Sequence, residues 1–270
     1  MSSQKQDLHI FTDNSIIPHN QVKSEHLFNL ITHVQGTSPT WLLNLLIENS
    51  LYGTCSINTD TNKQHRSNTS RSSVIFISFL NDFKFYASSL KKNGVEVQSN
   101  QSFKFIDLFT NLFDRVVPSN IESVSKLFDD LTQEIKNLSQ DKPIIFIEGL
   151  EFLLLSTDIS SIQCLSQLNK LHKLSSSVIL SCQSDEELID IATFNHPTHP
   201  QYKLHDFLVR ILHRTNLNIA LRPLETGKAK DITGTLSISK GCIPYESLDI
   251  AEKEYLYLVS KDQSAKLFFR

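Results

Sequence analysis

The sequence predicts an α/β protein in which helices flank a mainly parallel β-sheet, with antiparallel hairpins at its C-terminal end. Short unbroken apolar runs recur along the first two thirds of the chain, with Ile144–Ile147 as the central one. Runs of this kind are typical of strands buried on both faces of a parallel sheet. Helical patterns separate them. The last third changes to an alternation of apolar and polar residues, which indicates antiparallel strands.

The central strand is predicted at Pro143–Glu148, where the apolar run follows a helix-breaking proline. It ends on the acid Glu148, with Gly149 behind it. In open α/β sheets, ligands bind outside the carboxyl ends of such strands, so Glu148 stands where a nucleotide-binding protein keeps its Mg²⁺-linked acid. We therefore consider Glu148 as the remnant of a metal site. The alternative is a carboxyl group with no metal to bridge.

The phosphate-binding half of such a site is missing. A buried strand at Leu27–Thr32 is predicted to run through a tight loop into a helix with Ser38–Pro39 as its N-cap and first helical residue. This is the setting of a Walker A loop, G-x-x-x-x-G-K-[ST], in which glycine amides cradle the phosphates and the lysine reaches the terminal ones. Gly36 is present, but Trp41 and Leu42 stand where the second glycine and the lysine would fall.

The other elements follow from the same patterns. Further strands are expected at Leu8–Phe11 (a short edge strand), Val74–Phe79, Val178–Cys182, Leu217–Arg222 and Ile232–Ser239, with a final hairpin around Asp262 and Gln263. Further helices are expected at about Asn81–Lys92, after a capping box of Ser119 and Glu122, around Ile162–Leu171, and after a second capping box of Ser184 and Glu187. Phe103–Phe109 fits helix or strand, and both Phe152–Leu155 and Asn195–Pro200 are expected to be loops.

Composition limits the class of protein. The chain has 270 residues, of which 40% are hydrophobic, and we expect a single domain over residues 1–270. Its mean hydropathy of −0.18 is that of a soluble globular protein. The formal net charge of −3 excludes a strongly basic nucleic-acid binder, so any RNA contact would come from a local patch. We expect neither a membrane span nor a signal peptide.

Two further features concern the polar stretch Thr54–Ser73 and the cysteines. The polar stretch has too few apolar residues to order itself, so we expect a loop or a flexible insertion. Its basic residues Lys63, Arg66 and Arg71 either contact RNA or are only solvated.

The four cysteines are far apart and form no C-x-x-C pair, so we expect no disulfide framework or zinc site and a reducing compartment.

Up to this point the residues favour an α/β sheet of the RecA type with its nucleotide site missing. Three C-terminal stretches add a family resemblance: Leu221–Gly234 (LRPLETGKAKDITG), Glu254–Leu258 (EYLYL) and Lys266–Arg270 (KLFFR). Further matches are Gln6–Leu8 and Ile31–His33. With them the chain resembles the sixth-subunit family of the Elongator complex. The similarity runs from end to end and is firmest from about residue 216 onward.

The resemblance implies a RecA-like, P-loop NTPase-type fold without Walker A and Walker B motifs. It implies assembly with the fourth and fifth Elongator subunits, two copies of each, into a hetero-hexameric ring. That ring would bind tRNA and join the catalytic Elongator subcomplex, which starts the modification of the wobble uridine U34. ATP hydrolysis would belong to the assembled ring, so this chain would be no enzyme and hold no cofactor or metal. The resemblance also implies a cytoplasmic location, with a nuclear role attached to the family too.

Charged residues are candidates for contacts within such a ring. In RecA-type rings, nucleotide lies between neighbouring subunits, and one face can contribute a charged group to the site of the next. The predicted hairpin carries four basic candidates for this role or for contact with RNA phosphate: Arg222, Lys228, Lys230 and Lys240. The loop after Cys182 corresponds to one that lines the ring pore, which makes His196, His199 and Lys203 candidates to face tRNA. The alternative for the hairpin is a solvated, positively charged rim.

Two other functions remain open. One is a diverged nucleotide-binding α/β enzyme that uses Glu148. Against it stand the missing phosphate loop, the absence of G-x-S-x-G and H-E-x-x-H, and a total of only seven glycines. The other is a pure scaffold that holds partners without touching RNA or nucleotide, and composition does not separate it from the tRNA-binding ring. A salt-dependent loss of tRNA affinity on removal of this subunit would favour the ring.

Overall fold

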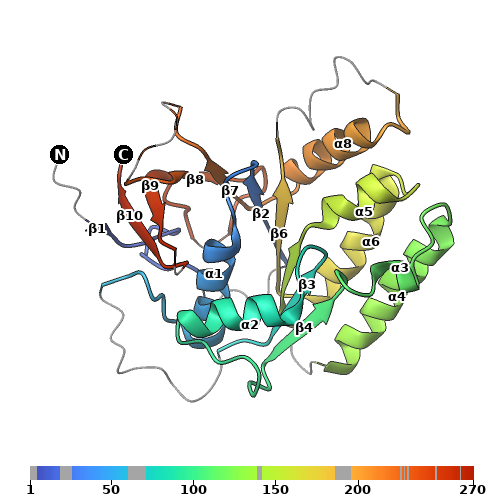
Figure 1. Cartoon of the computed structure of the whole chain (residues 1–270), viewed down its shortest axis with the longest axis horizontal. Coiled ribbons are helices and arrows are strands. Elements are labelled where there is room, and N and C mark those ends of the chain that lie inside the picture. The colour runs from blue at the N-terminus through green and yellow to red at the C-terminus, as the bar shows by residue number, and fades with distance from the viewer. Residues whose placement is uncertain are drawn as a thin grey trace.

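The computed structural model describes residues 5–18, 26–59, 71–138, 142–185, 196–225, 227, 229, 231–246, 248–261 and 263–270. In this part of the chain, ten strands form one sheet in the order β1-β10-β9-β8-β7-β2-β6-β5-β3-β4, with helices on both faces (Figure 1). The strands are β1 Lys5–Gln6, β2 Leu27–His33, β3 Val74–Ser78, β4 Phe103–Asp107, β5 Ile144–Glu148, β6 Ser177–Gln183, β7 Leu217–Arg222, β8 Gly234–Lys240, β9 Lys253–Val259 and β10 Ala265–Phe269. The helices are α1 Thr40–Tyr52, α2 Phe83–Lys92, α3 Leu112–Arg115, α4 Ile121–Leu138, α5 Leu150–Ser156, α6 Ser161–Leu174 and α8 Pro200–Leu212.

One half of the sheet is parallel and the other half is antiparallel. Neighbouring strands run parallel from β7 through β2, β6, β5 and β3 to β4. They run antiparallel from β7 through β8, β9 and β10 to β1. All five residues of β5 are buried, as its unbroken apolar run predicts. The predicted fold class is therefore confirmed, including the C-terminal hairpins.

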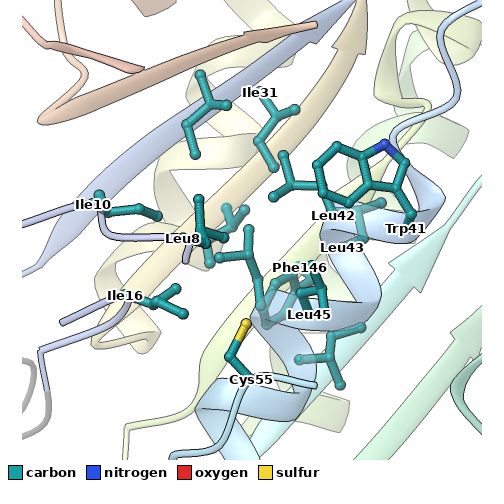
Figure 2. Packing of buried hydrophobic residues seen from close by; sticks show 14 of the residues in the cluster. Leu8, Ile10, Ile16, Ile31, Trp41, Leu42, Leu43, Leu45, Cys55 and Phe146 are labelled. Atoms are coloured by element: carbon teal, nitrogen blue, oxygen red, sulfur yellow. The ribbon is translucent and has the colours of Figure 1, made fainter. Parts of the chain in front are cut away.

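Two hydrophobic clusters cover the two faces of the sheet. On one face, α1 and α2 pack with the N-terminal segment and the C-terminal strands. On the other face, α4, α5, α6 and α8 cover the parallel strands (Figure 1). Every residue of α1 from Thr40 to Leu51 is buried, which confirms that this helix is enclosed on most sides. Figure 2 shows Leu8 and Ile10 of the N-terminal segment in the same cluster as Leu42 and Leu45 of α1.

The N-terminal segment differs from the prediction. The edge strand expected at Leu8–Phe11 is wrong: β1 lies earlier and pairs with β10, and Phe11 forms only an isolated bridge to Ile250. Leu8 and Ile10 are buried beneath α1, so their apolar character reflects packing and not membership of the sheet. Helix α1 begins one residue later than expected, at Thr40.

Helix α4 confirms the helix expected after Ser119, but its cap differs from the one predicted. The side chain of Asn120, and not that of Ser119, accepts a hydrogen bond from the backbone amide of Glu122 at 2.9 Å. Asparagine is as good a cap as serine, and here it stands directly before the first helical residue. The apolar side of α4 packs against the sheet and α6 as expected. The ambiguous stretch before α3 is the strand β4.

Two helices lie where the sequence indicated loops or gave no signal. Phe152–Leu155 belongs to α5 and not to a loop, because Leu150, Leu153 and Leu154 recur at helical spacing on its buried side. Helix α8 was not predicted, although His199 caps it and Pro200 occupies its first position. The capping box that would join Ser184 to Glu187 falls partly outside the described residues.

The polar stretch Thr54–Ser73 begins with an ordered segment. Cys55 and Ile57 are buried in the core, and the carboxylate of Glu48 accepts hydrogen bonds from Thr54 Oγ1 at 2.8 Å and from the Ser56 amide at 3.0 Å. The buried Glu48 on α1 therefore holds Thr54 and Ser56, and Asp7 accepts hydrogen bonds from the amide and hydroxyl of Thr59. Residues 60–70, with Lys63 and Arg66, lie outside the described residues. None of the described helices is long and apolar enough to span a membrane.

Candidate functional site

The carboxyl edge of the parallel strands is where a nucleotide would bind in a fold of this class. Strand β2 lies between β6 and β7, and α1 leads from it to β3 on the far side of β5. From β2 the chain passes through α1 to β3 on one side, and from β6 it passes through α8 to β7 on the other side of β2. Ligands in open α/β sheets bind outside the carboxyl ends of the strands at such a point. The loop between β2 and α1, residues 34–39, is therefore the counterpart of a phosphate loop.

This loop binds a carboxylate of the chain itself. The backbone amide of Gln35 donates a hydrogen bond to Asp185 Oδ1 at 2.7 Å, and Asp185 follows the carboxyl end of β6. Thr37 closes the turn, since its hydroxyl donates to the Val34 carbonyl at 2.7 Å and accepts from the Val34 amide at 3.0 Å. Gly36 has a φ of 86°, a left-handed conformation that suits glycine. The carboxylate of Asp185 is thus bound to a backbone amide that a phosphate loop would offer to its ligand.

The first turn of α1 carries the buried side chain of Trp41. Trp41 is only 2% exposed, and its ring lies 5.1 Å from that of Tyr257 on β9. Leu42, next to it, is fully buried. The two residues at the second-glycine and lysine positions of the missing motif are therefore core residues. The Trp41 ring nitrogen and the Tyr257 hydroxyl have no hydrogen-bond partner among the described residues.

Three charged or titratable side chains meet at the carboxyl ends of β2, β6 and β7. Burial, together with the nearby Arg222 guanidinium, lowers the pKa of His33 to about 4 against the opposing effect of Asp185. Burial also lowers the pKa of Arg222, again opposed by Asp185. The guanidinium donates to the Leu221 carbonyl at 3.0 Å and approaches Thr32 Oγ1 at 3.4 Å. At neutral pH this edge therefore contains a neutral histidine beside an arginine and an aspartate.

Glu148 lies beneath the surface and is hydrogen-bonded within the protein. It is 2% exposed, and the Tyr86 hydroxyl donates to its Oε2 atom. The side chain of Leu80 covers Gly149, where an added Cβ would come within 2.4 Å of Leu80 Cγ. Burial, with a contribution from Glu151, raises the pKa of Glu148 to about 8. The carboxyl group is therefore mostly protonated at neutral pH and is bound to Tyr86 within the protein.

Glu151 is a second buried acid at this edge. Its Oε1 atom accepts a hydrogen bond from the Gln183 amide at 2.8 Å, which joins α5 to the end of β6. Burial raises its pKa to about 7, although the hydrogen bond from Gln183 favours the ionised form. No group of three His, Cys, Asp or Glu side chains within the described ranges could hold a metal ion. The carboxyl edge therefore contains charged side chains that are paired within the protein, and the two buried acids Glu148 and Glu151.

The structure separates the basic candidates of the hairpin. Arg222 ends β7 at the carboxyl edge, but Lys240 pairs with Leu217 at the other end of that strand. Arg222 and Lys240 therefore lie at opposite ends of β7, so these two candidates do not share one rim of the sheet. The Lys240 ammonium lies 3.4 Å from Asp249 Oδ1 on the surface. Lys228 and Lys230 are outside the described residues.

The candidates near α8 divide in the same way. His196 is exposed in the turn before α8, with its Nδ1 atom 2.8 Å from Thr198 Oγ1. His199 is partly exposed, and its Nδ1 atom accepts from the Gln201 amide at 3.3 Å. Lys203 is 6% exposed, and its ammonium donates to the Thr157 carbonyl at 2.6 Å. Lys203 thus joins α8 to the end of α5, and its buried ammonium is directed into the protein and not toward RNA.

Sequence reasoning missed most residues that shape this edge. Asp185, His33, Glu151 and Tyr86 were not candidates. Asp185 and His33 carried a usable signal, since both are polar and lie at or just after the ends of buried strands. Tyr86 lies on α2 and meets Glu148 across 62 residues of sequence, so no local pattern could have revealed it.

The fold and this edge define a RecA-like α/β protein whose phosphate loop is replaced by core residues and an internal carboxylate. The fold has a similar solved structure, a KaiC-like protein from Pyrococcus horikoshii, with a TM-score of 0.55 and 11% identity over 93% of this chain and 100% of that one. No family model matches the chain. The chain is 30% identical to "Elongator complex protein 6" of Saccharomyces cerevisiae, over 100% of this chain and 99% of that protein. It is 26% identical to "Elongator complex protein 6 homolog" of Schizosaccharomyces pombe, over 73% of this chain and 80% of that one. The chain belongs to the Elongator complex protein 6 family.

Proposed function

We propose that this chain is a non-catalytic subunit of the Elongator complex. It assembles with the fourth and fifth subunits, two copies of each, into a hetero-hexameric RecA-like ring. The ring binds tRNA and supports wobble-uridine (U34) modification by the catalytic subcomplex. The observation that carries this proposal is the 30% identity, over essentially the whole of both chains, to a protein named as the sixth Elongator subunit.

The carboxyl edge supports the expectation that the isolated chain does not hydrolyse ATP. The Gln35 amide is bound to Asp185, and Trp41 and Leu42 are buried where a glycine and a lysine would meet phosphate. Glu148 is covered and protonated, so it offers no charge to Mg²⁺. ATP hydrolysis is thus expected only in the assembled ring, with nucleotide held by other subunits.

Contact with tRNA would come from a few exposed basic groups, because the net charge of −3 gives no general attraction to phosphate. Arg222 is half-buried at the carboxyl edge, and His196 and His199 lie in the turn before α8. Lys228 and Lys230, which lie between β7 and β8 in the sequence and outside the described residues, are the other candidates. Lys240 lies at the other edge of the sheet, so it would contact RNA or a neighbouring subunit independently. The expected location is the cytoplasm, with a nuclear pool in addition.

The first test is the native mass of this chain co-expressed with the fourth and fifth subunits. We expect six chains with two copies of this one. On that assembly, tRNA affinity should fall as salt concentration rises, and charge reversal at Lys228 and Lys230 should weaken it. A chain that stays monomeric beside both partners would refute the ring.

The same assembly separates the remaining alternatives. A pure scaffold predicts that tRNA affinity and ATP turnover are both unchanged when these basic residues are reversed. A diverged enzyme predicts nucleotide binding by the isolated chain, which a titration with a fluorescent ATP analogue would detect.

A further inference from the structure

Apolar side chains gather on the surface beyond the carboxyl ends of β4 and β5. Phe109 and Phe113 are 56% and 53% exposed, and Phe152 on α5 is 39% exposed. The rings of Phe113 and Phe152 meet edge to face with their centroids 6.1 Å apart, although they come from different helices. Val117 is also exposed and lies in the loop that follows α3. We call these four residues the phenylalanine patch. Soluble proteins rarely expose apolar groups together in this way unless the surface binds something.

The patch is held in one arrangement by backbone hydrogen bonds. The Asp158 amide donates to the Pro118 carbonyl at 2.9 Å, which joins the end of α5 to the loop after α3. The Val117 amide donates to Ser123 Oγ at 3.0 Å, which fixes that loop against α4. Little conformational entropy would therefore be lost when a partner covers the rings, and a pre-organised surface of this kind favours binding. Figure 1 shows α3 and α4 on the side of the molecule away from both chain termini.

Acidic side chains outnumber basic ones around the patch. The segments 107–122 and 150–162 carry one basic residue, Arg115, and it is already paired with Asp130 on α4 at 3.5 Å. The same segments carry four acids that reach the surface at least in part: Asp107, Asp114, Glu122 and Asp158. Negative charges around an apolar centre complement a partner segment in which basic residues flank apolar ones.

We propose that the phenylalanine patch is a docking surface for a short apolar segment flanked by Lys or Arg on another Elongator subunit. The apolar residues of that segment would cover Phe113 and Phe152, and its basic residues would lie beside Asp114. The charges argue against RNA as the occupant, because phosphate would face the same acids. They also argue against a second copy of this chain docking patch to patch, since acidic rims would then oppose each other. The proposal rests on the proposed function in one respect, that the partner is sought among the Elongator subunits.

The test replaces both central rings by serine and compares the double variant F113S/F152S with the wild type. Purified chain would be titrated separately against the fourth subunit, the fifth subunit and the catalytic subcomplex. Loss of two aromatic anchors is expected to weaken binding to one of these by about tenfold or more. Asp114→Lys should weaken the same interaction with little effect on folding, and its effect should shrink as salt rises. Leu138→Ser is the matched control: this apolar residue is 42% exposed on α4 but lies about 25 Å from the start of that helix.

A photo-crosslinking benzoylphenylalanine at position 113 identifies the occupant directly, because it keeps the aromatic ring. We expect a crosslink to a segment with apolar residues between Lys or Arg. If the wild type assembles with other Elongator subunits and F113S/F152S binds them equally well, the docking proposal is wrong and the proposed function survives. Crosslinking to tRNA or to a second copy of this chain would also overturn it. If the wild type binds no Elongator subunit, the proposed function and this docking proposal are both refuted.

Discussion

The carboxylate of Asp185 accepts a hydrogen bond from the backbone amide of Gln35 at 2.7 Å. The two residues are 150 positions apart in sequence and lie at the carboxyl ends of the neighbouring strands β6 and β2. A phosphate loop would keep such an amide free for its ligand, so the contact ties the loop to the protein's own β6. Arg222 on β7 lies close enough for Asp185 to raise its pKa against the effect of burial. The edge is thus stabilised by internal charges.

Replacing Asp185 with alanine is expected to lower the free energy of unfolding by about 1–2 kcal/mol, because the hydrogen bonds from the Gln35 amide and the Gln183 side chain are both lost at a partly exposed site. The variant is not expected to gain nucleotide binding, because Trp41 and Leu42 still fill the first turn of α1. Urea denaturation measures the first effect, and titration with a fluorescent ATP analogue measures the second. Asp185→Asn retains an oxygen that can accept from Gln35 and should lose less stability. Nucleotide binding by the alanine variant would show that Asp185 alone closes the site.

Gly149→Ala tests how closely the end of β5 is packed. Gly149 has a φ of 78°, and an added Cβ would lie 2.4 Å from Leu80 Cγ. We expect a loss of about 2–4 kcal/mol, from backbone strain and overpacking together. Gly36→Ala is the matched control, since φ is 86° there but no atom lies within 4 Å of the new Cβ, and it should lose only about 1 kcal/mol. Equal losses in the two variants, measured by urea denaturation, would mean that contact with Leu80 contributes nothing.

Two buried tyrosines are expected to respond in opposite ways to loss of the hydroxyl. Tyr86 donates to Glu148, so Tyr86→Phe leaves a buried carboxyl without this partner and should reduce stability by about 1–3 kcal/mol. The hydroxyl of Tyr257 has no partner among the described residues. Tyr257→Phe should therefore be neutral or stabilising. Fluorescence of Trp41, the one tryptophan of the chain, reports the unfolding of both variants. A loss in Tyr257→Phe as large as that in Tyr86→Phe would contradict the assignment.

The parallel half of the fold could be predicted because buried strands leave a local signal. Ile144–Ile147 is an unbroken apolar run and Leu27–Thr32 is mostly apolar, and the structure confirms a strand at each place. Helix α5 was missed because it is short and begins directly after Gly149, so that only its leucines at helical spacing distinguish it from a buried loop. Leu8 and Ile10 gave the opposite error, since they are apolar through burial under α1 and not through strand pairing.

The candidate site was much less predictable, because it depends on register and on contacts between distant residues. Arg222 and Lys240 are separated by a short hairpin in sequence, yet the antiparallel register places them at opposite edges of the sheet. Lys203 is charged, and only the packing of α8 against α5 shows that its ammonium is bound to the Thr157 carbonyl. Glu148 was placed correctly at the end of its strand. Its partner Tyr86 lies on another element, so the protonated state of Glu148 could not be inferred from sequence.

The raised pKa of Glu148, about 8 in the folded protein, predicts a specific dependence of stability on pH. An unfolded glutamate has a pKa of about 4.3, so between these values the folded protein binds more protons than the unfolded chain, and stability falls as pH rises. Glu151 adds the same trend up to its pKa of about 7, and His33, with a lowered pKa of about 4, contributes the opposite trend only below about 6.5. Between pH 7 and 8 the effect of Glu148 should therefore dominate.

In that interval we expect the free energy of unfolding of the wild type to fall by about 1 kcal/mol. Glu148→Gln stays neutral and can still accept from Tyr86, so its stability should be nearly constant from pH 7 to 8 and exceed that of the wild type at pH 8. Glu151→Gln is the control, because it keeps Glu148 and should keep most of the slope. Urea denaturation at pH 6.5, 7, 7.5 and 8 provides the comparison. If Glu148→Gln lost as much stability as the wild type over this range, the carboxyl group of Glu148 would already be ionised in the folded protein at pH 7.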